Sequence, residues 1–239
     1  MEMMELIPGI FASTDRCLVT GSTLIIADLH IGYESALEND GIHLPRMQGR
    51  LMSEKLIYLI DRFEIEKVVV LGDFKHEFSR NLNQEWREVQ ALLELIKNTS
   101  EVVMVRGNHD NYLVTILSKM GIPMIDLYKE NGVTFVHGHK DIRSRPLIMA
   151  HEHPSIRITD SVGAYVKLPC FVHHEGMGIM VIPAFSPLAL GTDLSTVTSD
   201  DYLSPLLKGK ELGGAQIIAC SEVGLLPLGK LSDLRGLRV

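Results

Sequence analysis

Short apolar runs alternate with longer amphipathic segments over the first two thirds of the chain. Five runs of four or five residues contain many β-branched side chains and predict buried strands. They cover residues 23–27, 68–71, 102–105, 133–136 and 147–150. Because these runs are apolar throughout rather than alternating, we expect both faces of their sheets to be covered.

Two of the segments between these runs have the spacing of an amphipathic helix. In the first, Met52, Leu56, Leu59 and Phe63 step by four, three and four residues. In the second, the apolar stripe consists of Trp86, Val89, Leu93 and Ile96. Such stripes are typical of helices that pack one face against a core, and we therefore assign Trp86 no function.

From about Ser155 the pattern changes to strands without long helical stripes. Predicted strands cover residues 156–159, 165–173, 177–182, 215–219 and 223–228, with a hairpin turn at 176–178 and a brief helix at 203–207. The pattern as a whole predicts an α/β chain with a more β-rich second part. No repeat or linker interrupts residues 1–239, and we expect a single domain.

Composition restricts the class of protein. The chain has 239 residues, of which 46% are hydrophobic, as expected for a globular core. Its three cysteines, Cys17, Cys170 and Cys220, form no CxxC pair, which argues against a disulfide framework and against a thiolate zinc site. The sequence has no signal-peptide pattern and no membrane-spanning run, so we expect a cytoplasmic protein without a membrane partner.

The net charge of −7 argues against broad, charge-driven binding to duplex nucleic acid. It does not exclude nucleic acid at a metal site, because two divalent cations would add four positive charges to the cleft that holds them.

Each of the five first runs is followed by residues that can bind a metal. These residues are Asp28 and His30; Asp73 and His76; Asn108, His109 and Asp110; His137 and His139; and His151 and His153. Ligands in open α/β sheets bind outside the carboxyl ends of the strands, so we expect these side chains to gather at one edge. One polar strand end is common, but five in series indicate a site.

Carboxylate, imidazole and amide donors without thiolate suit Mn²⁺, Fe²⁺ or Zn²⁺. This many donors exceeds the needs of one tetrahedral ion and fits two ions that share a bridging carboxylate. Asp73, in the middle of the series, is the candidate bridge. Two such ions about 3.5–4 Å apart can stabilise the attacking and leaving oxygens of a phosphoryl transfer.

Together these motifs resemble the calcineurin-like metallophosphoesterases. The resemblance rests, in order, on Asp28-x-His30, Gly72-Asp73, Gly107-Asn108-His109-Asp110, His137-Gly138-His139 and His151-x-His153, between residues 28 and 153. The stretches "DLHIGYE", "GDFKHEF" and "PAFSPLALGTDLS" are similar to the SbcD-related or ICC-like phosphoesterases of archaea.

The resemblance implies a four-layer αββα sandwich of two mixed β-sheets flanked by helices, with residues 155–239 completing the second sheet. It also implies two divalent metal ions, with Mn²⁺ expected first and Fe²⁺, Zn²⁺ or Ni²⁺ as alternatives. Asp73 would bridge the ions. Asp28, His30 and His153 would hold the first ion, and Asn108, His137 and His151 the second.

In the mechanism that the resemblance implies, a hydroxide bridging the metals attacks phosphorus. His109 would act as the general acid, and Asp110 would orient its imidazole. Ala150 departs from the family, whose last motif usually has glycine at this position, and alanine narrows the backbone options next to His151.

Five further residues have open interpretations. His76 supports the metal ligands, contacts the substrate or faces solvent, and His139 has the same alternatives. Arg106 either contacts a phosphate oxygen or is a surface cation. Arg143 and Arg145 either make the cleft attractive to an anionic substrate or form an exposed basic loop.

We therefore expect a metal-dependent phosphoesterase that acts on phosphodiesters. The alternatives are a DNA or RNA nuclease of the SbcD type and, from another class, a non-catalytic scaffold with the same fold. The intact set of ligands argues against the scaffold. The expected partner is a phosphate-ester substrate, nucleic acid is an open possibility, and the family allows a homodimer.

Overall fold

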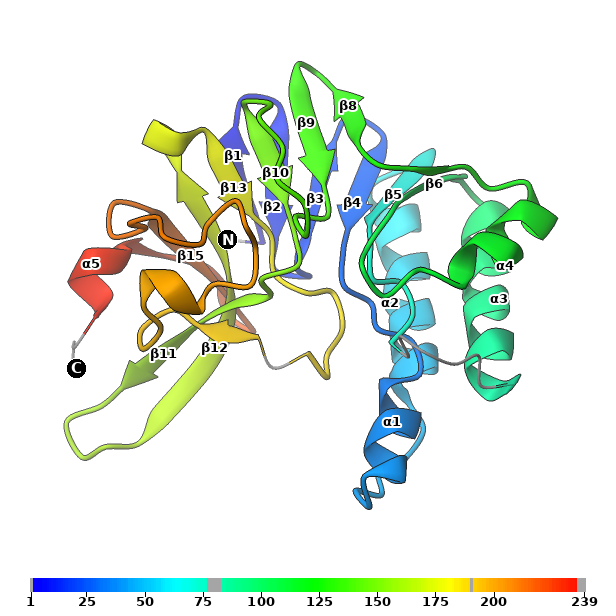
Figure 1. Cartoon of the computed structure of the whole chain (residues 1–239), viewed down its shortest axis with the longest axis horizontal. Coiled ribbons are helices and arrows are strands. Elements are labelled where there is room, and N and C mark those ends of the chain that lie inside the picture. Colours follow the sequence, from blue (N-terminus) through cyan, green and yellow to red (C-terminus); the bar gives the residue numbers. More distant parts are fainter. Residues whose placement is uncertain (1, 77–82, 190, 236–239) are drawn as a thin grey trace.

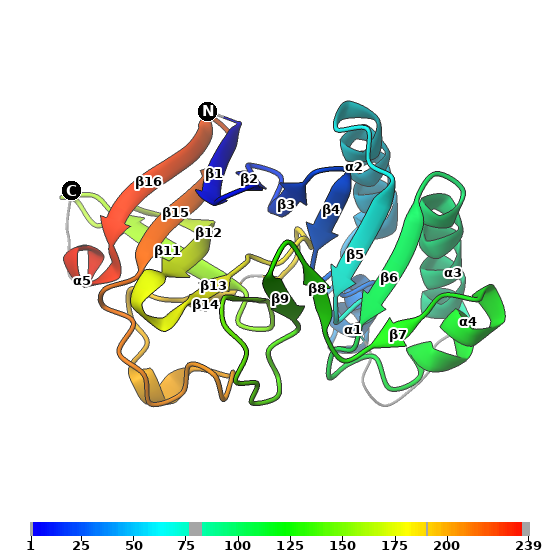
Figure 2. The same cartoon turned by 90° about the horizontal axis from the view of Figure 1, so that it is seen from above.

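The computed structural model describes residues 2–76, 83–189 and 191–235. Within them, the first part of the chain forms a seven-stranded sheet whose strands follow one another in chain order (Figures 1 and 2). The strands are β1 (Met3–Ile7), β2 (Ile10–Ser13), β3 (Cys17–Thr20), β4 (Thr23–Ile26), β5 (Lys67–Leu71), β6 (Glu101–Val105) and β7 (Met124–Ile125). β1 to β4 are antiparallel and β4 to β7 are parallel.

The second sheet is also mixed and has nine strands in the described residues. They are β8 (Tyr128–Glu130), β9 (Val133–Val136), β10 (Leu147–Met149), β11 (Pro154–Thr159), β12 (Tyr165–His174), β13 (Ile179–Val181), β14 (Thr192–Asp193), β15 (Gln216–Ser221) and β16 (Gly224–Lys230). β10 pairs in parallel with both β9 and β13, so that several strands deliver their carboxyl ends to one edge.

The helices of the described residues lie mainly on the first sheet. They are α1 (Tyr33–Asn39), α2 (Gln48–Arg62), α3 (Asn83–Lys97), α4 (Leu113–Met120) and α5 (Leu231–Leu234), with 3₁₀ helices η1 (Glu175–Met177) and η2 (Ser199–Asp201). α2 and α3 lie side by side on the outer face of the first sheet (Figure 2). No helix in the described residues is long and apolar enough to span a membrane.

Alternate residues of the central strands face different cores, which explains their uninterrupted apolar sequences. Val68 and Val70 of β5 pack against the helices, whereas Val69 and Leu71 pack between the two sheets. All four side chains are fully buried. The apolar run of a central strand is therefore the signature of a layer covered on both faces.

The outer face of the second sheet has a core of its own. Leu194, Tyr202, Leu206 and Leu231 cover it, and they come from turns, the residue after η2, and α5 rather than from long helices. The described residues thus form an α/β fold with two mixed sheets between two outer layers, as the sequence predicted. The second outer layer contains less helix than the first.

All five early strand predictions are confirmed, each with ends within one residue of β4, β5, β6, β9 and β10. The two helical stripes correspond to α2 and α3. The hairpin turn at 176–178 is also confirmed, and η1 shortens the strand predicted to begin at 177. The brief helix predicted at 203–207 is wrong. This segment forms bends and a single turn instead, in which the N–H groups of Leu207 and Lys208 both donate to the Ser204 carbonyl.

Candidate metal centre

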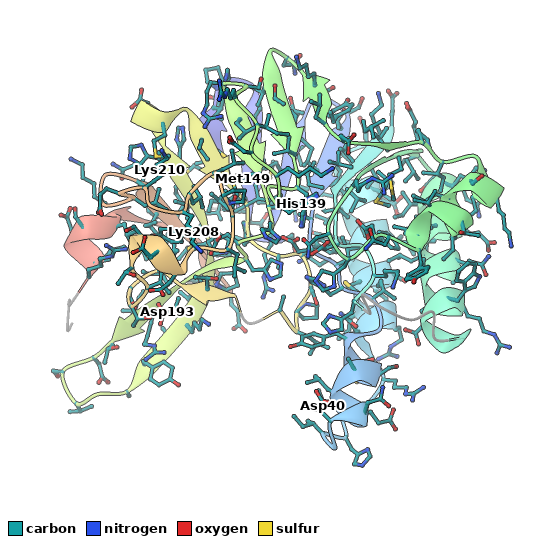
Figure 3. The ribbon with its side chains drawn as sticks, viewed as in Figure 1. Asp40, His139, Met149, Asp193, Lys208 and Lys210 are labelled. Carbon is teal, nitrogen blue, oxygen red and sulfur yellow. The ribbon has the colours of Figure 1, made fainter. Side chains whose placement is uncertain are left out.

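The carboxyl ends of strands from both sheets meet at one edge. β4, β5 and β6 are parallel and end two or three residues before Asp28, Asp73 and Asn108. β9 and β10 end just before the histidine motifs of the second sheet. Figure 3 labels Met149, the last residue of β10, near His139, which follows β9. The polar residues of five strand ends are therefore neighbours in space.

The first cluster consists of Asp28, His30 and His153, one ligand atom of each lying within 4.8 Å of the others. His30 Nε2 is 3.3 Å from His153 Nε2, and His153 Nε2 is 3.3 Å from Asp28 Oδ1. Two imidazole nitrogens that face each other beside a carboxylate oxygen form a donor set that a divalent cation can occupy.

The second cluster consists of Asp73, His137 and His151, with the same 4.8 Å spacing. His137 Nε2 lies 3.4 Å from Asp73 Oδ2 and 3.0 Å from Asn108 Oδ1. The Nδ1 atom of His137 lies 2.8 Å from the Leu71 carbonyl oxygen, which can only accept, so this nitrogen donates and Nε2 is the candidate ligand atom.

Asp73 belongs to the second cluster and also lies close to the first. Its Oδ2 atom is 4.0 Å from His30 Nε2 in the first cluster and 3.4 Å from His137 Nε2 in the second. Each cluster also combines residues from both sheets, since Asp28, His30 and Asp73 follow first-sheet strands and the other three follow second-sheet strands. The arrangement suits two cations that share one carboxylate.

The donor set fits two divalent metal ions. Asp28 Oδ1 is buried and has no hydrogen-bond partner of good geometry among the described residues. His153 Nε2 lies 3.3 Å from this atom, and a cation bound between the two would satisfy the buried carboxylate oxygen more fully. Oxygen and imidazole donors without thiolate match the harder divalent cations.

Five of the candidate ligands have left-handed backbone conformations although none is glycine. Their φ angles are 55° at Asp28, 48° at His30, 51° at Asp73, 69° at His151 and 45° at His153. For a residue with a Cβ atom this conformation costs roughly 1–2 kcal/mol. Strain of this kind persists where surrounding contacts fix it, and it concentrates at functional sites.

Two glycines allow the loops under the ligands to pack closely. A Cβ atom at Gly107 would lie 2.2 Å from Asp73 Oδ1 and 2.3 Å from the Asp73 backbone nitrogen. A Cβ atom at Gly72 would lie 2.7 Å from His137 Nδ1 and from the Gly107 backbone. No side chain fits at either position without moving a candidate ligand.

The charges of the site favour ionised carboxylates. Burial alone would raise the pKa of Asp28 and Asp73, but the facing histidines outweigh it and lower both pKa values. His153 acts on Asp28, and His137 acts on Asp73 through a hydrogen bond and its charge. The two carboxylates are therefore ionised and ready to bind a cation.

Two of the imidazoles are held neutral. Burial, together with the charge of a neighbouring histidine, lowers the pKa of His30 to about 3 and that of His151 to about 4. A neutral imidazole has a free lone pair, which is the form that binds metal.

His109 lies at the edge of the clusters. Its Nε2 atom is 3.9 Å from Asp73 Oδ2, and its Nδ1 atom is 2.7 Å from the backbone carbonyl oxygen of His76. That carbonyl can only accept, so Nδ1 donates and Nε2 faces the site.

Asp110 differs from the expectation that it orients His109. Its buried carboxylate accepts from the backbone N–H groups of Asp73, Phe74 and Gly107 at 2.9–3.0 Å. Burial, then the charge of Asp73, raises the pKa of Asp110 to about 6. Asp110 therefore fixes the loops that carry Asp73 and Asn108. The group that contacts the imidazole of His109, where Asp110 was expected, is the His76 carbonyl.

His76 and His139 both lie beside the clusters. The ring of His76 is edge-on to His30 at 5.4 Å and stacks on Tyr33 at 4.1 Å. The ring of His139 is 5.2 Å from that of His137. Both positions fit side chains that support the ligands.

The three arginines lie further out. Arg106 Nε is 3.9 Å from the exposed carboxylate of Asp126, which favours its interpretation as a surface cation. Arg143 and Arg145 line a cavity of about 410 Å³ together with Lys210. Arg145 is held in place by the carbonyl groups of Ile142, Ser144 and Met177.

Ala150 is accommodated without disturbing its neighbour. It is fully buried between the sheets, its φ angle is not positive, and its N–H donates to the His137 carbonyl at 2.9 Å. The left-handed turn begins one residue later, at His151, which still joins the second cluster.

The sequence did not reveal several residues that shape the site. A cavity of about 350 Å³ beside His109 is lined by Tyr33, Glu152, Thr192 and Leu203 in addition to the ligand histidines. Tyr33 lies three residues after His30, and Glu152 lies between two ligands, so proximity to the motifs was the only available signal. The segment that contains Leu203 is distant in sequence and gave none.

The buried Gln48 amide and the loop that contains Ser186 contact the backbone that carries the first cluster. The Gln48 side chain contacts the carbonyl groups of Leu29 and His30 and the hydroxyl of Ser186 at 2.9–3.1 Å. The backbone N–H of Ser186 donates to the Asp28 carbonyl at 3.3 Å. The start of the stretch "PAFSPLALGTDLS" thus contacts the backbone next to the first cluster, since Phe185 N–H also donates to the Ala27 carbonyl at 2.9 Å. Leu190 of this stretch is outside the described residues.

Comparisons with known proteins bear on the family and on the fold. The model of the calcineurin-like phosphoesterase family matches residues 21–174, more than half of the chain. The crystal structure of nuclease MPE from Pseudomonas putida has a TM-score of 0.70, with 19% identity over 95% of this chain and 98% of that one. The phosphoesterase YfcE from E. coli has a TM-score of 0.39 and 15% identity, over 89% and 94% of the two chains. No curated protein sequence matches significantly.

Proposed function

This chain belongs to the calcineurin-like phosphoesterase family, and we propose that it acts as a single domain to hydrolyse phosphodiesters with two divalent cations. The observation that carries the proposal is the pair of three-residue clusters around Asp73, with His109 Nε2 3.9 Å from the shared carboxylate. The donor chemistry supports Mn²⁺, with Fe²⁺, Zn²⁺ and Ni²⁺ as alternatives.

When bound, two divalent cations stabilise charge on the phosphoryl oxygens and lower the pKa of the attacking water. The protein's own residues would supply the ligands of both ions. In the proposed assignment Asp73 bridges, the first site uses Asp28, His30 and His153, and the second site uses Asn108, His137 and His151.

His109 is the proposed general acid. The His76 carbonyl fixes Nδ1 of His109 as a donor, so a proton for the leaving oxygen would come from Nε2. Nε2 faces the cavity that is lined by Tyr33 and Leu203, and we propose that this cavity holds the leaving group. Proton transfer of this kind typically contributes about 10²–10⁴-fold to the rate.

The nature of the diester separates two candidate substrates. The cavity beside His109 has a volume of about 350 Å³ and an aromatic pair, Tyr33 stacked on His76, which suits a planar group such as a nucleobase in a small diester. A nuclease is the second candidate. It is supported by the basic cavity of Arg143, Arg145 and Lys210, which could hold a further phosphate, and by the fold shared with the Pseudomonas putida nuclease.

The test is a comparison of three substrates with Mn²⁺-loaded protein. They are a chromogenic phosphodiester, the matching monoester and labelled single-stranded DNA. Asp73→Ala and His109→Ala should lose activity toward the diester, whereas His43→Ala should keep it, because His43 is a surface histidine with a 79% exposed side chain. Activity that survives Asp73→Ala would contradict the two-metal proposal.

DNA cleavage would identify a nuclease, and the basic cavity can then be tested directly. Joint substitution Arg143→Ala and Lys210→Ala should raise KM for DNA and leave kcat for the small diester unchanged. Cleavage of the small diester alone would leave a nucleotide-like metabolite as the substrate class. The non-catalytic scaffold would be favoured only if the protein failed to bind two metals in excess Mn²⁺.

A further inference from the structure

The turn that carries His151 and His153 is strained at both ligands. Their φ angles of 69° and 45° lie in the left-handed region, at a cost of roughly 1–2 kcal/mol for each residue. The two ligands belong to different clusters, so a change in this turn would move both candidate metal sites. Contacts from outside the turn must therefore fix its conformation.

The residue between these ligands makes such contacts. The Glu152 side chain is buried, with 1% of the residue exposed. It accepts from Leu203 N–H at 3.0 Å and from Ser204 N–H at 3.1 Å, both through Oε2. These hydrogen bonds join the turn to a segment 51 residues further along the chain.

The same segment reaches the other histidine motif. Ser204 is fully buried, and its hydroxyl donates to the Gly138 carbonyl at 2.6 Å. Gly138 lies between His137 and His139 and has a φ of 112°. Residues 203–204 are thus bonded to both histidine-bearing loops of the second sheet.

We propose that Glu152 and Ser204 are positioning residues that set the distance between the His137 loop and the His151–His153 turn, and with it the affinity of the metal centre. The proposal rests on the proposed function only in assuming that these histidines bind metal. Leu203, 60% exposed, lines the cavity beside His109, so the same contacts also place a wall of that cavity.

The primary measurement is the affinity of metal-stripped protein for Mn²⁺, by isothermal titration calorimetry. Glu152→Ala should weaken binding by roughly 10–100-fold, the usual effect of removing a residue that supports metal ligands. Ser204→Ala should act in the same direction. If the two residues work as one unit, the double variant should lose less affinity than the two single losses combined.

A conservative variant separates hydrogen bonding from charge. In Glu152→Gln the amide oxygen can take the place of Oε2 and accept from both Leu203 and Ser204. Its Mn²⁺ affinity should therefore stay within about threefold of the original protein, since most of the geometry is kept. This variant and Ser204→Ala carry the test if Glu152→Ala fails to fold.

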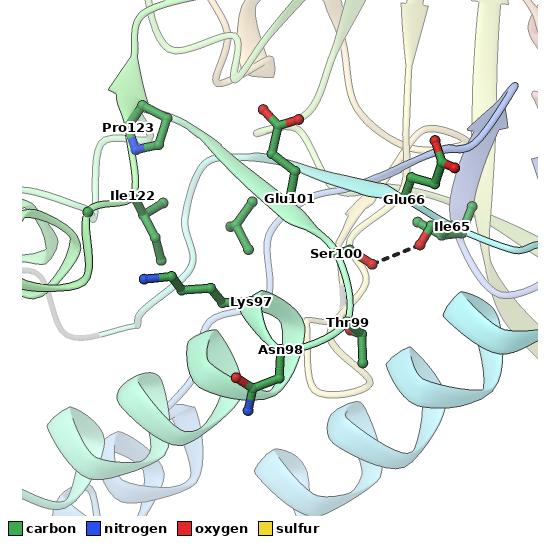
Figure 4. A pocket seen from close by; sticks show the side chains of 11 residues that line it. Ile65, Glu66, Lys97, Asn98, Thr99, Ser100, Glu101, Ile122 and Pro123 are labelled. Carbon is green, nitrogen blue, oxygen red and sulfur yellow. Dashed lines mark hydrogen bonds between the residues drawn. The ribbon is translucent and has the colours of Figure 1, made fainter.

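Ser100→Ala is the matched control. Ser100 is a nearly buried serine, 8% exposed, whose hydroxyl donates to the Ile65 carbonyl at 2.8 Å, next to the pocket shown in Figure 4. It precedes β6, at the end of that strand opposite to Asn108. We expect a similar loss of thermal stability without metal as for Ser204→Ala, but an unchanged Mn²⁺ affinity.

The outcomes distinguish this inference from the proposed function. If Glu152→Ala and Ser204→Ala lower stability but bind Mn²⁺ as tightly as Ser100→Ala, the two residues are merely structural and the inference is wrong. If the variants lose affinity while the original protein binds two metals but hydrolyses no phosphodiester, the inference stands and the proposed function fails. Failure of the original protein to bind Mn²⁺ would overturn both.

Discussion

A methyl group added at Gly107 should disable the metal centre. In Gly107→Ala the new Cβ atom would meet Asp73 Oδ1 at 2.2 Å, the Asp73 nitrogen at 2.3 Å and Asp110 Oδ2 at 2.9 Å. Ordinary contact begins near 3.4 Å, so the loop has to move by about 1 Å. Both carboxylates are buried and cannot swing into solvent.

The size of the effect follows from the bonds that this movement breaks. The movement would stretch or break three hydrogen bonds to carboxylates. They are Gly107 N–H to Asp110 at 2.9 Å, Asp73 N–H to Asp110 at 2.9 Å and His109 N–H to Asp73 at 3.0 Å. A hydrogen bond to a charged group contributes about 1.5–3 kcal/mol, so loss of two costs about 3–6 kcal/mol of unfolding free energy. A displacement of about 1 Å at a reacting centre also lowers the rate by about 10²-fold.

The matched control is the same chemical change in a helix. A Cβ atom at Gly49, in α2, would have only Glu88 Oε2 within 4 Å, at 3.9 Å, and no steric conflict. Gly49→Ala should therefore stabilise the protein by about 0.5–1 kcal/mol. Urea unfolding in EDTA measures stability, and hydrolysis of a chromogenic phosphodiester with Mn²⁺ measures activity. The reasoning is refuted if Gly107→Ala matches the original protein in both.

Three further predictions address pH, metal and packing. Burial lowers the pKa of His173 below its usual 6.5, so this residue binds a proton more readily in the unfolded chain. The free energy of unfolding should therefore fall as pH drops below about 6.5, and urea unfolding of His173→Gln should show a smaller fall. Mn²⁺ at about 100 times its Kd should add about 2.7 kcal/mol of stability for each site that it fills, seen as a higher Tm than in EDTA, and Asp73→Asn should lose this gain. Val69→Ala, between the sheets, should cost about 2 kcal/mol in urea unfolding, whereas Val223→Ala, 82% exposed, should change it by less than about 0.5 kcal/mol.

The sequence predicted the parts of the fold whose signal is local. After their charged first residues, β5 and β6 are apolar because both of their faces are buried, and a polar residue follows each strand at the sheet edge. Such runs show where each strand ends, and so place Asp73 and Asn108 at strand ends without knowledge of the partner strands. By contrast, the residues of β1 are only partly buried or exposed, so the run Met3–Ile7 carries no comparable pattern.

Long-range contacts account for what the sequence did not show. The partners of Glu152 are 51 and 52 residues away, and a carboxylate between two histidines has no pattern that indicates them. The role expected for Asp110 differed for a similar reason, since two of its three donors lie 36 and 37 residues away.

The chain passes from the first sheet to the second only once in the described residues, between Ile125 of β7 and Tyr128 of β8. Asp126 and Leu127, at this crossing, are both exposed. A chain opened there would yield two fragments, each with one sheet and only part of each metal cluster. Neither fragment alone could assemble the set of ligands around Asp73. If metal binding returned when the fragments were mixed, this would show that one sheet had docked on the other. Metal binding could therefore be used to measure reassembly of the split protein.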